Sequence, residues 1–168
     1  MELQIVPMCE VVEWMEGLLR QSHISSIKLI SLLGGDRASC CDEAAVIKDC
    51  SQIVAVSSIA PFGEGRNPGL EKMAREPGRK RMGKRLGLGK PGEPTIVGVF
   101  VLPEYRRKGM GYQVLEAAIR RCIERSLVPI RIDSMSAGIM RAIDRLPEEL
   151  HQHLQVNDQG DVMDMMPG

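Results

Sequence analysis

Aromatic side chains are scarce in this chain of 168 residues, which has one Trp, two Tyr and two Phe, or 3% of the sequence. The interior must therefore be filled by aliphatic side chains and by eleven Met, whose flexible side chains suit irregular gaps in a core. The apolar fraction of 43% and the charged fraction of 26% are those of an ordinary globular protein. The length predicts one domain over residues 1–168.

The sequence also lacks the features of a membrane or secreted protein. No stretch approaches the ~20 apolar residues that cross a bilayer, and the N-terminus has no basic region followed by an apolar run. The five Cys are odd in number and have no CxxC spacing. The adjacent Cys40 and Cys41 could form a redox or metal feature, but a pair without further ligands is more often incidental. We therefore expect a cytoplasmic protein with free thiols, no metal and no contact with membranes.

Net charge gives no information about partners, because 22 basic residues balance 22 acidic ones. Residues 63–93, however, hold nine basic and four acidic residues, so this segment is +5 and the remainder −5. Its eight Gly and three Pro predict an irregular loop, and a loop of this length is usually functional or mobile. The segment has no aromatic residue on which bases could stack. Nucleic acid is therefore not the expected partner. The alternative to a functional loop is a solvated loop without a role.

Hydrophobic periodicity divides the rest of the chain into short strands and helices. Strands are predicted at residues 3–6, 44–49, 52–59, 95–101, 128–133 and 154–156, with residues 161–165 completing a closing hairpin. Helices are predicted after Pro7, over residues 27–33, after Gly111 and over residues 136–146. The nearly continuous apolar run 95–101 is typical of a central strand buried on both faces.

The segment most informative about function is residues 99–111, between this apolar strand and the next helix. It combines a strand, a tight turn with Gly109 and Gly111 two positions apart, and an exposed helix N-terminus. Glycines let the backbone approach a ligand closely, and free N–H groups at a helix N-terminus favour an anion. Three consecutive basic residues before Gly109 add positive charge. The segment therefore predicts a turn that binds a phosphate or pyrophosphate.

Other interpretations compete on the residues alone. A plain strand-to-helix turn with solvated basic side chains would contain the same two glycines. A dinucleotide-binding fingerprint needs a third glycine and an acidic residue ~20 positions later, so the match is poor. A Walker loop is excluded, because no Gly-Lys-Ser/Thr occurs in the sequence.

The pattern Val101-x-Pro103-Glu104-Tyr105-Arg106-x-x-Gly109-x-Gly111, followed by an amphipathic helix, resembles the coenzyme A-binding motif of the GNAT family of N-acetyltransferases. In that family the motif is Arg or Gln, two residues, Gly, one residue, then Gly or Ala. The specific likeness covers residues 95–126, and the rest of the chain agrees only in the order of its elements. The resemblance implies an α+β fold with a central mixed, mostly antiparallel sheet, flanked by helices and splayed between its fourth and fifth strands.

The resemblance further implies acetyl-coenzyme A as co-substrate and direct transfer of its acetyl group to an amine of an unidentified small molecule or protein. Backbone N–H groups of residues 107–112 would hold the pyrophosphate, and the strand backbone would pair with the pantetheine arm and polarise the thioester carbonyl. A non-catalytic coenzyme A-binding sensor or interaction module is the alternative, and a homodimer is compatible with either. The residues implied in coenzyme binding are Val99, Phe100, Val101, Arg106, Arg107, Lys108, Gly109, Met110, Gly111 and Tyr112.

The sequence departs from many relatives at the positions of the catalytic base and acid. Residues 96–101 contain no Glu, and residues 136–141 contain no Tyr. Asp133, at the end of its predicted strand, and Glu64 remain as candidates for the base, although such carboxylates are more often solvated or capping. Ser136 is a candidate donor to the departing thiolate, although capping the next helix is its commoner role. In this family's layout the basic loop 63–93 lies near the acceptor site.

Overall fold

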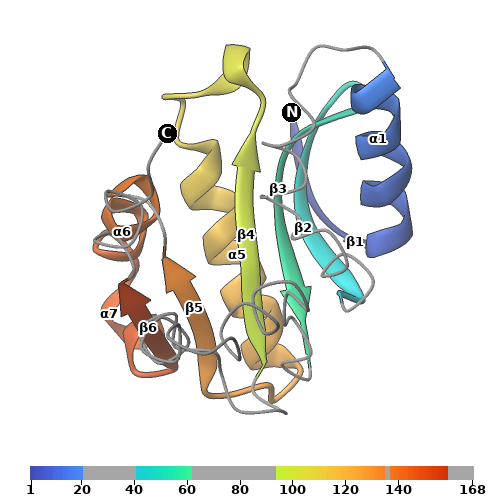
Figure 1. Ribbon diagram of the computed structural model, residues 1–168. Helices are drawn as coiled ribbons and strands as arrows, with labels where there is room; N and C mark the ends of the chain where they lie inside the picture. Colours follow the sequence, from blue (N-terminus) through green and yellow to red (C-terminus); the bar gives the residue numbers. More distant parts are fainter. Residues whose placement is uncertain (21–40, 62–93, 135–136, 159–168) are drawn as a thin grey trace, which may run out of the picture.

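Six strands form one sheet, in which each strand neighbours the next one along the chain (Figure 1). The computed structural model describes residues 1–20, 41–61, 94–134 and 137–158. Strands β1 to β4 pair antiparallel, whereas β4 with β5 and β5 with β6 pair parallel. The mixed, mostly antiparallel sheet expected from the resemblance is therefore confirmed. The strands are β1 (Glu2–Pro7), β2 (Glu43–Asp49), β3 (Gln52–Ala60), β4 (Thr95–Val101), β5 (Ile130–Ser134) and β6 (Leu154–Asp158).

Helices flank this sheet, and the best defined of them is the amphipathic helix that follows the glycine turn. Its buried side chains recur at helical spacing and form one stripe, as predicted. They are Met110, Val114, Leu115, Ala118, Ile119 and Cys122. The helices are α1 (Met8–Arg20), α5 (Met110–Glu124), α6 (Ala137–Ile143) and α7 (Glu148–His151), with a 3₁₀ turn η2 (Pro103–Tyr105) after β4.

The two longer helices cover opposite faces of the sheet (Figure 1). A β-carbon placed on Gly111 of α5 would lie 3.6 Å from Val99 and 3.5 Å from Val101 of β4. Phe100 lies between these two valines, and its ring centroid is 6.0 Å from that of Trp14 in α1. Because successive side chains of a strand point to opposite faces, β4 separates α5 from α1.

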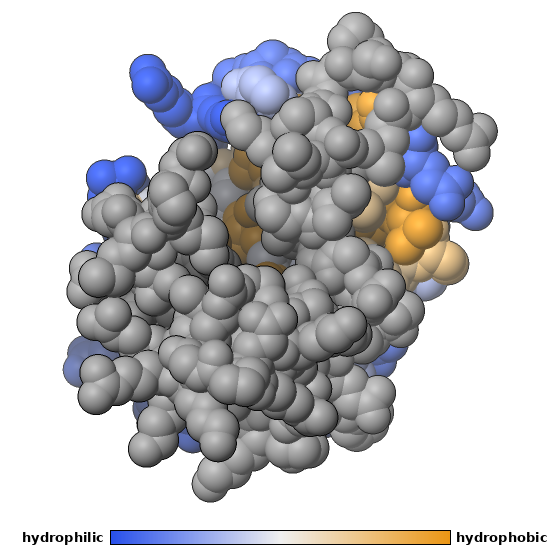
Figure 2. All heavy atoms as spheres, in the orientation of Figure 1, coloured by the Kyte–Doolittle hydropathy of each residue, from blue (hydrophilic) through white to orange (hydrophobic). Residues whose placement is uncertain are grey.

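The core is deepest at β2 and β3, which are covered on both faces. Every residue from Ala44 to Ile47 and from Ile53 to Ala60 is buried. The small and β-branched side chains of these strands suit such a two-sided environment. Figure 2 shows a further apolar area at the surface, on the side of the molecule where α1 lies.

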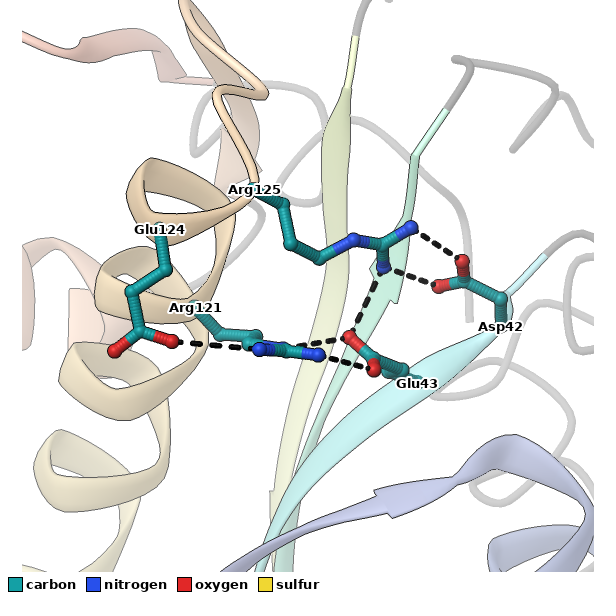
Figure 3. A network of polar contacts seen from close by, with 5 residues as sticks. All are labelled: Asp42, Glu43, Arg121, Glu124 and Arg125. Atoms are coloured by element: carbon teal, nitrogen blue, oxygen red, sulfur yellow. Dashed lines mark hydrogen bonds and ion pairs between the residues drawn. The ribbon is translucent and has the colours of Figure 1, made fainter.

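The C-terminal end of α5 is fixed to the start of β2 by ion pairs (Figure 3). Arg121 donates two hydrogen bonds to Glu43, of 2.7 and 2.9 Å, and a weaker one to Glu124 at 3.4 Å. Arg125 donates to both oxygens of Asp42, at 2.8 and 3.1 Å, and to Glu43 at 3.0 Å. Bidentate contacts of this kind orient the two elements as well as attract them.

Three predictions about the elements need correction. In β4 only Ile96 and Phe100 are buried, so the strand is not buried on both faces. Its other residues are half-exposed, and one of them, Val99, lines a pocket. The helix predicted over residues 136–146 ends at Ile143, and the short helix α7 follows it. The hairpin turn predicted at residues 157–160 begins too early, because Asn157 and Asp158 belong to β6 and pair in parallel with β5. The predicted helix 27–33, the basic loop 63–93 and the last strand 161–165 lie outside the described residues.

Candidate coenzyme-binding site

Strands β4 and β5 run side by side only at their beginnings. Their register contains two pairs, Thr95 with Arg131 and Ile96 with Ile132. Beyond these pairs the strands diverge toward the top of Figure 1, as expected from the resemblance. No strand among the described ranges pairs with the remaining length of β4 on this side.

The backbone of β4 faces this opening at alternate residues. The N–H of Leu102 donates to the carbonyl of Val54 in β3 at 2.9 Å, so Leu102 is directed toward β3. Because N–H and C=O directions alternate along a strand, the backbone groups of Val99 and Val101 point away from β3, toward the diverging β5. The carbonyl of Val101 accepts a hydrogen bond from Arg106 Nε at 3.1 Å, which agrees with this direction. The opening is therefore lined by strand backbone that an extended ligand can pair with.

A pocket of about 210 Å³ lies beside this backbone, between β4, α5 and α6. Glycines and apolar side chains form most of its wall, and the ring of Tyr112 adds a polar group. Its members are Val99, Gly111, Tyr112, Leu115, Gly138, Ile139 and Ala142. Such a lining suits a narrow, mostly apolar arm with few polar atoms.

The glycine turn lies at the N-terminal end of α5. Gly109 is the N-cap residue with φ of 79°, and Arg107 also has positive φ, at 62°. No side chain caps this helix end, so the first N–H groups of α5 have no side-chain acceptor. Free amides and the helix dipole together favour a phosphate at this position.

Two contacts hold the turn against the sheet, and a third lies within the turn. Arg106 binds the Val101 carbonyl, as described above, so its Nε serves the turn itself. The hydroxyl of Tyr105 donates to Asp49 Oδ2, at the end of β2, at 2.9 Å. The ammonium of Lys108 lies 5.1 Å from the centroid of the Tyr105 ring, a distance at which the ring face attracts a cation.

Some of the predicted coenzyme-binding residues contribute side chains to the pocket, and others do not. Val99, Gly111 and Tyr112 line the pocket with their own atoms. The side chain of Phe100 packs on Trp14 at the other face, and its backbone is directed toward β3. The side chain of Met110 is buried in the core, so at this position only the backbone N–H at the start of α5 is available to the site. Tyr112 hydrogen-bonds to Glu116 one turn further along α5, and this contact raises the pKa of the tyrosine hydroxyl.

The candidate catalytic residues are only partly placed. Asp133 lies in β5 directly after Ile132, which is the last residue of this strand to pair with β4. It therefore belongs to the diverging part of the strand. Glu64 and Ser136 lie outside the described residues. Cys122 is fully buried, and burial raises the pKa of its thiol to about 12.

Comparison with known proteins identifies the family. The sequence profile of the acetyltransferase (GNAT) family matches residues 37–137, which is more than half of the chain. The chain belongs to the GNAT family. No curated protein matches the sequence of this GNAT protein. Among the described residues no helix is long and apolar enough to cross a membrane.

Solved structures with a similar fold are N-acetyltransferases. The polyamine N-acetyltransferase of Drosophila melanogaster matches with a TM-score of 0.53 at 15% identity, over 86% of this chain and 81% of that one. An aminoglycoside 6′-N-acetyltransferase from Acinetobacter haemolyticus matches with a TM-score of 0.45 at 16% identity, over 86% of this chain and 88% of that one. At 15% identity the likeness to the Drosophila enzyme shows the fold alone and leaves the acceptor undetermined.

Two parts of the site were missed by sequence reasoning. The wall of the pocket on the side of α6 is formed by Gly138, Ile139 and Ala142. The available signal was the spacing of the two small residues, Gly138 and Ala142, which lie one helical turn apart. The contact between Tyr105 and Asp49 joins residues 56 positions apart, and nothing in the sequence pairs them.

Proposed function

We propose that this GNAT protein is an acetyl-coenzyme A-dependent N-acetyltransferase that acetylates an amine of a small molecule or a protein. The observation that carries the proposal is the junction of three features: the open backbone edge of β4, the pocket beside it and the uncapped start of α5. These features suit successive parts of the coenzyme. The strand edge and the pocket suit the thioester and the pantetheine arm, and the helix start suits the pyrophosphate.

Two glycines of the site support the proposal. Gly109 has a backbone conformation that side chains with a β-carbon rarely adopt, and Gly111 keeps the pocket open beside Val99. The coenzyme supplies an activated acetyl group as a thioester. The N–H of Val101, directed into the opening, is placed to donate to the thioester carbonyl oxygen as negative charge develops there.

The chemistry proposed is direct transfer. The amine nitrogen attacks the thioester carbonyl carbon, the new C–N bond forms, and the C–S bond breaks to release the coenzyme thiolate. One proton leaves the amine nitrogen, and one is taken up by the thiolate. Asp133, in the diverging part of β5, is the candidate that accepts the amine proton, directly or through water. Holding the two substrates together in the opening supplies much of the rate.

A non-catalytic coenzyme A-binding module is the second candidate. It is favoured by the absence of Glu from residues 96–101 and of Tyr from residues 136–141. Both candidates predict coenzyme binding at the same site, and only the first predicts turnover.

The test is binding and turnover measured on the same preparation. Calorimetry with coenzyme A and acetyl-coenzyme A reports binding. Mass spectrometry of mixtures with a panel of polyamines, aminoglycosides and peptides with free N-termini reports the acetylated product. Binding together with product supports the transferase. Binding without product for any amine supports the module, and absence of binding refutes both.

A further inference from the structure

We infer that Asp49, the last residue of β2, is a positioning residue for coenzyme binding that acts through Tyr105. The inference rests on the proposed function, because it concerns the same turn. Asp49 lies at the hairpin between β2 and β3, and the glycine turn follows β4. The carboxylate therefore reaches the coenzyme turn from a different part of the sheet.

The contacts form a continuous chain from the sheet to the turn. Asp49 Oδ2 accepts the hydrogen bond of the Tyr105 hydroxyl at 2.9 Å, which fixes the far end of the tyrosine ring. The ring in turn has the Lys108 ammonium 5.1 Å from its centroid. Lys108 directly precedes Gly109, the N-cap of α5. Fixing the ring therefore fixes the direction of a cation and of the backbone that leads into the helix.

The local conformation explains why the turn needs such a contact. Arg107 and Gly109 both have positive φ, of 62° and 79°, on either side of Lys108. A non-glycine residue holds this conformation only where surrounding structure imposes it. No side chain caps the start of α5, so local hydrogen bonding of that kind does not stabilise the turn. The Asp49–Tyr105 and Arg106–Val101 contacts, in contrast, join it to β2 and β4.

The hydrogen bond has a defined direction. It raises the pKa of the Tyr105 hydroxyl, with burial adding in the same sense. The hydroxyl therefore stays protonated and donates over the whole physiological range. Asp49 acts on the coenzyme only through this donor, and touches neither the pocket nor the helix start.

A merely structural contact would make a different prediction. It would change the stability of the fold and leave coenzyme affinity unaltered in variants that remain folded. A positioning contact changes the dissociation constant and KM of the coenzyme, because a disordered turn must be reordered when the ligand binds. At saturating coenzyme it leaves kcat unchanged, since neither residue lies at the reacting atoms.

The experiment is a double-mutant cycle on coenzyme A affinity, measured by calorimetry. Asp49→Ala and Tyr105→Phe each remove the same hydrogen bond, and Tyr105→Phe keeps the ring under Lys108. We expect each variant to weaken binding about 3- to 10-fold, the range that corresponds to the net contribution of one ordinary, partly exposed hydrogen bond. The double variant should be no weaker than either single one. Asp49→Asn keeps an acceptor oxygen and should recover most of the affinity.

The matched control removes an ion pair made by Lys48, the residue of β2 next to Asp49. Lys48 pairs with Glu10 of α1 at 3.1 Å, and this pair does not involve the turn. Glu10→Gln should therefore leave coenzyme A affinity unchanged. Unaltered affinity in folded Asp49→Ala and Tyr105→Phe, or additive losses in the double variant, would overturn the inference. Failure of the unmodified protein to bind coenzyme A would instead refute the proposed function.

Discussion

Replacing Glu43 by Gln should destabilise the protein in a pH-dependent way. Glu43 accepts two hydrogen bonds from Arg121 and one from Arg125, and its side chain is 24% exposed (Figure 3). Charge-assisted hydrogen bonds contribute roughly 1.5–3 kcal/mol in favourable settings, and exposed ion pairs contribute roughly 0–1 kcal/mol. For this partly exposed group we expect a loss of about 1–2 kcal/mol in the free energy of unfolding. The corresponding fall in Tm is about 2–8 °C for a chain of this size.

The pH dependence follows from the carboxyl group. The hydrogen bond from Arg121 lowers the pKa of Glu43 below its ordinary value of 4.5. A lowered pKa means that the folded state favours the charged form, so this stabilisation is complete above the ordinary pKa. It is lost as the pH falls through the folded-state value. The difference in unfolding free energy between the two proteins should therefore be constant near neutrality and shrink below about pH 4.5.

Urea denaturation between pH 3.5 and 8 measures this difference. Arg121→Met is the second arm of the cycle, and its effect should not add to that of Glu43→Gln. Glu10→Gln removes the more exposed pair with Lys48 and should cost less than ~1 kcal/mol. Additive effects, or a difference that does not shrink in acid, would refute the assignment of this stability to the pair.

Two further predictions concern the site and the core. Gly111→Val should weaken coenzyme A binding about 5- to 150-fold by calorimetry, since the added methyl groups enter the pocket and overpacking costs about 1–3 kcal/mol. Gly111→Ala should bind nearly normally. Its β-carbon would meet Val99 and Val101 at ordinary contact distances of 3.6 and 3.5 Å. Equal affinity of both variants would place the ligand elsewhere. Cys122 should resist alkylation in the native protein while exposed Cys50 reacts, because burial raises the pKa of the Cys122 thiol to about 12. An acetyl adduct on Cys122, detected by mass spectrometry, would contradict direct transfer.

Local sequence signals predicted the parts of the fold that depend on nearby residues. The stripe from Val114 to Cys122 defines α5, and the two short apolar runs on either side of the hairpin define β2 and β3. The glycine turn was predicted for a related reason, because Gly109 satisfies a backbone requirement within a few residues. In each case the residues that carry the signal lie close along the chain, although the glycine turn is also held by the distant Asp49.

Features that depend on distant contacts were not predictable. One face of β4 is half-exposed, and its Val99 lines the pocket beside α6; neither property can be read from residues 95–101 alone. Asn157 and Asp158 resemble turn residues, yet pairing with Asp133 and Ser134 of β5 extends them as strand. Tertiary hydrogen bonding overrides local turn preference at that point.

The divergence of β4 from β5 gives the sheet an edge in its interior. Unpaired strand backbone is a template for any extended chain, and proteins usually protect such edges from self-association. A coenzyme arm lying along β4 would act as the missing neighbour and would stabilise the folded state by mass action. The ligand-free protein should then aggregate more readily on storage than the same protein kept with coenzyme A.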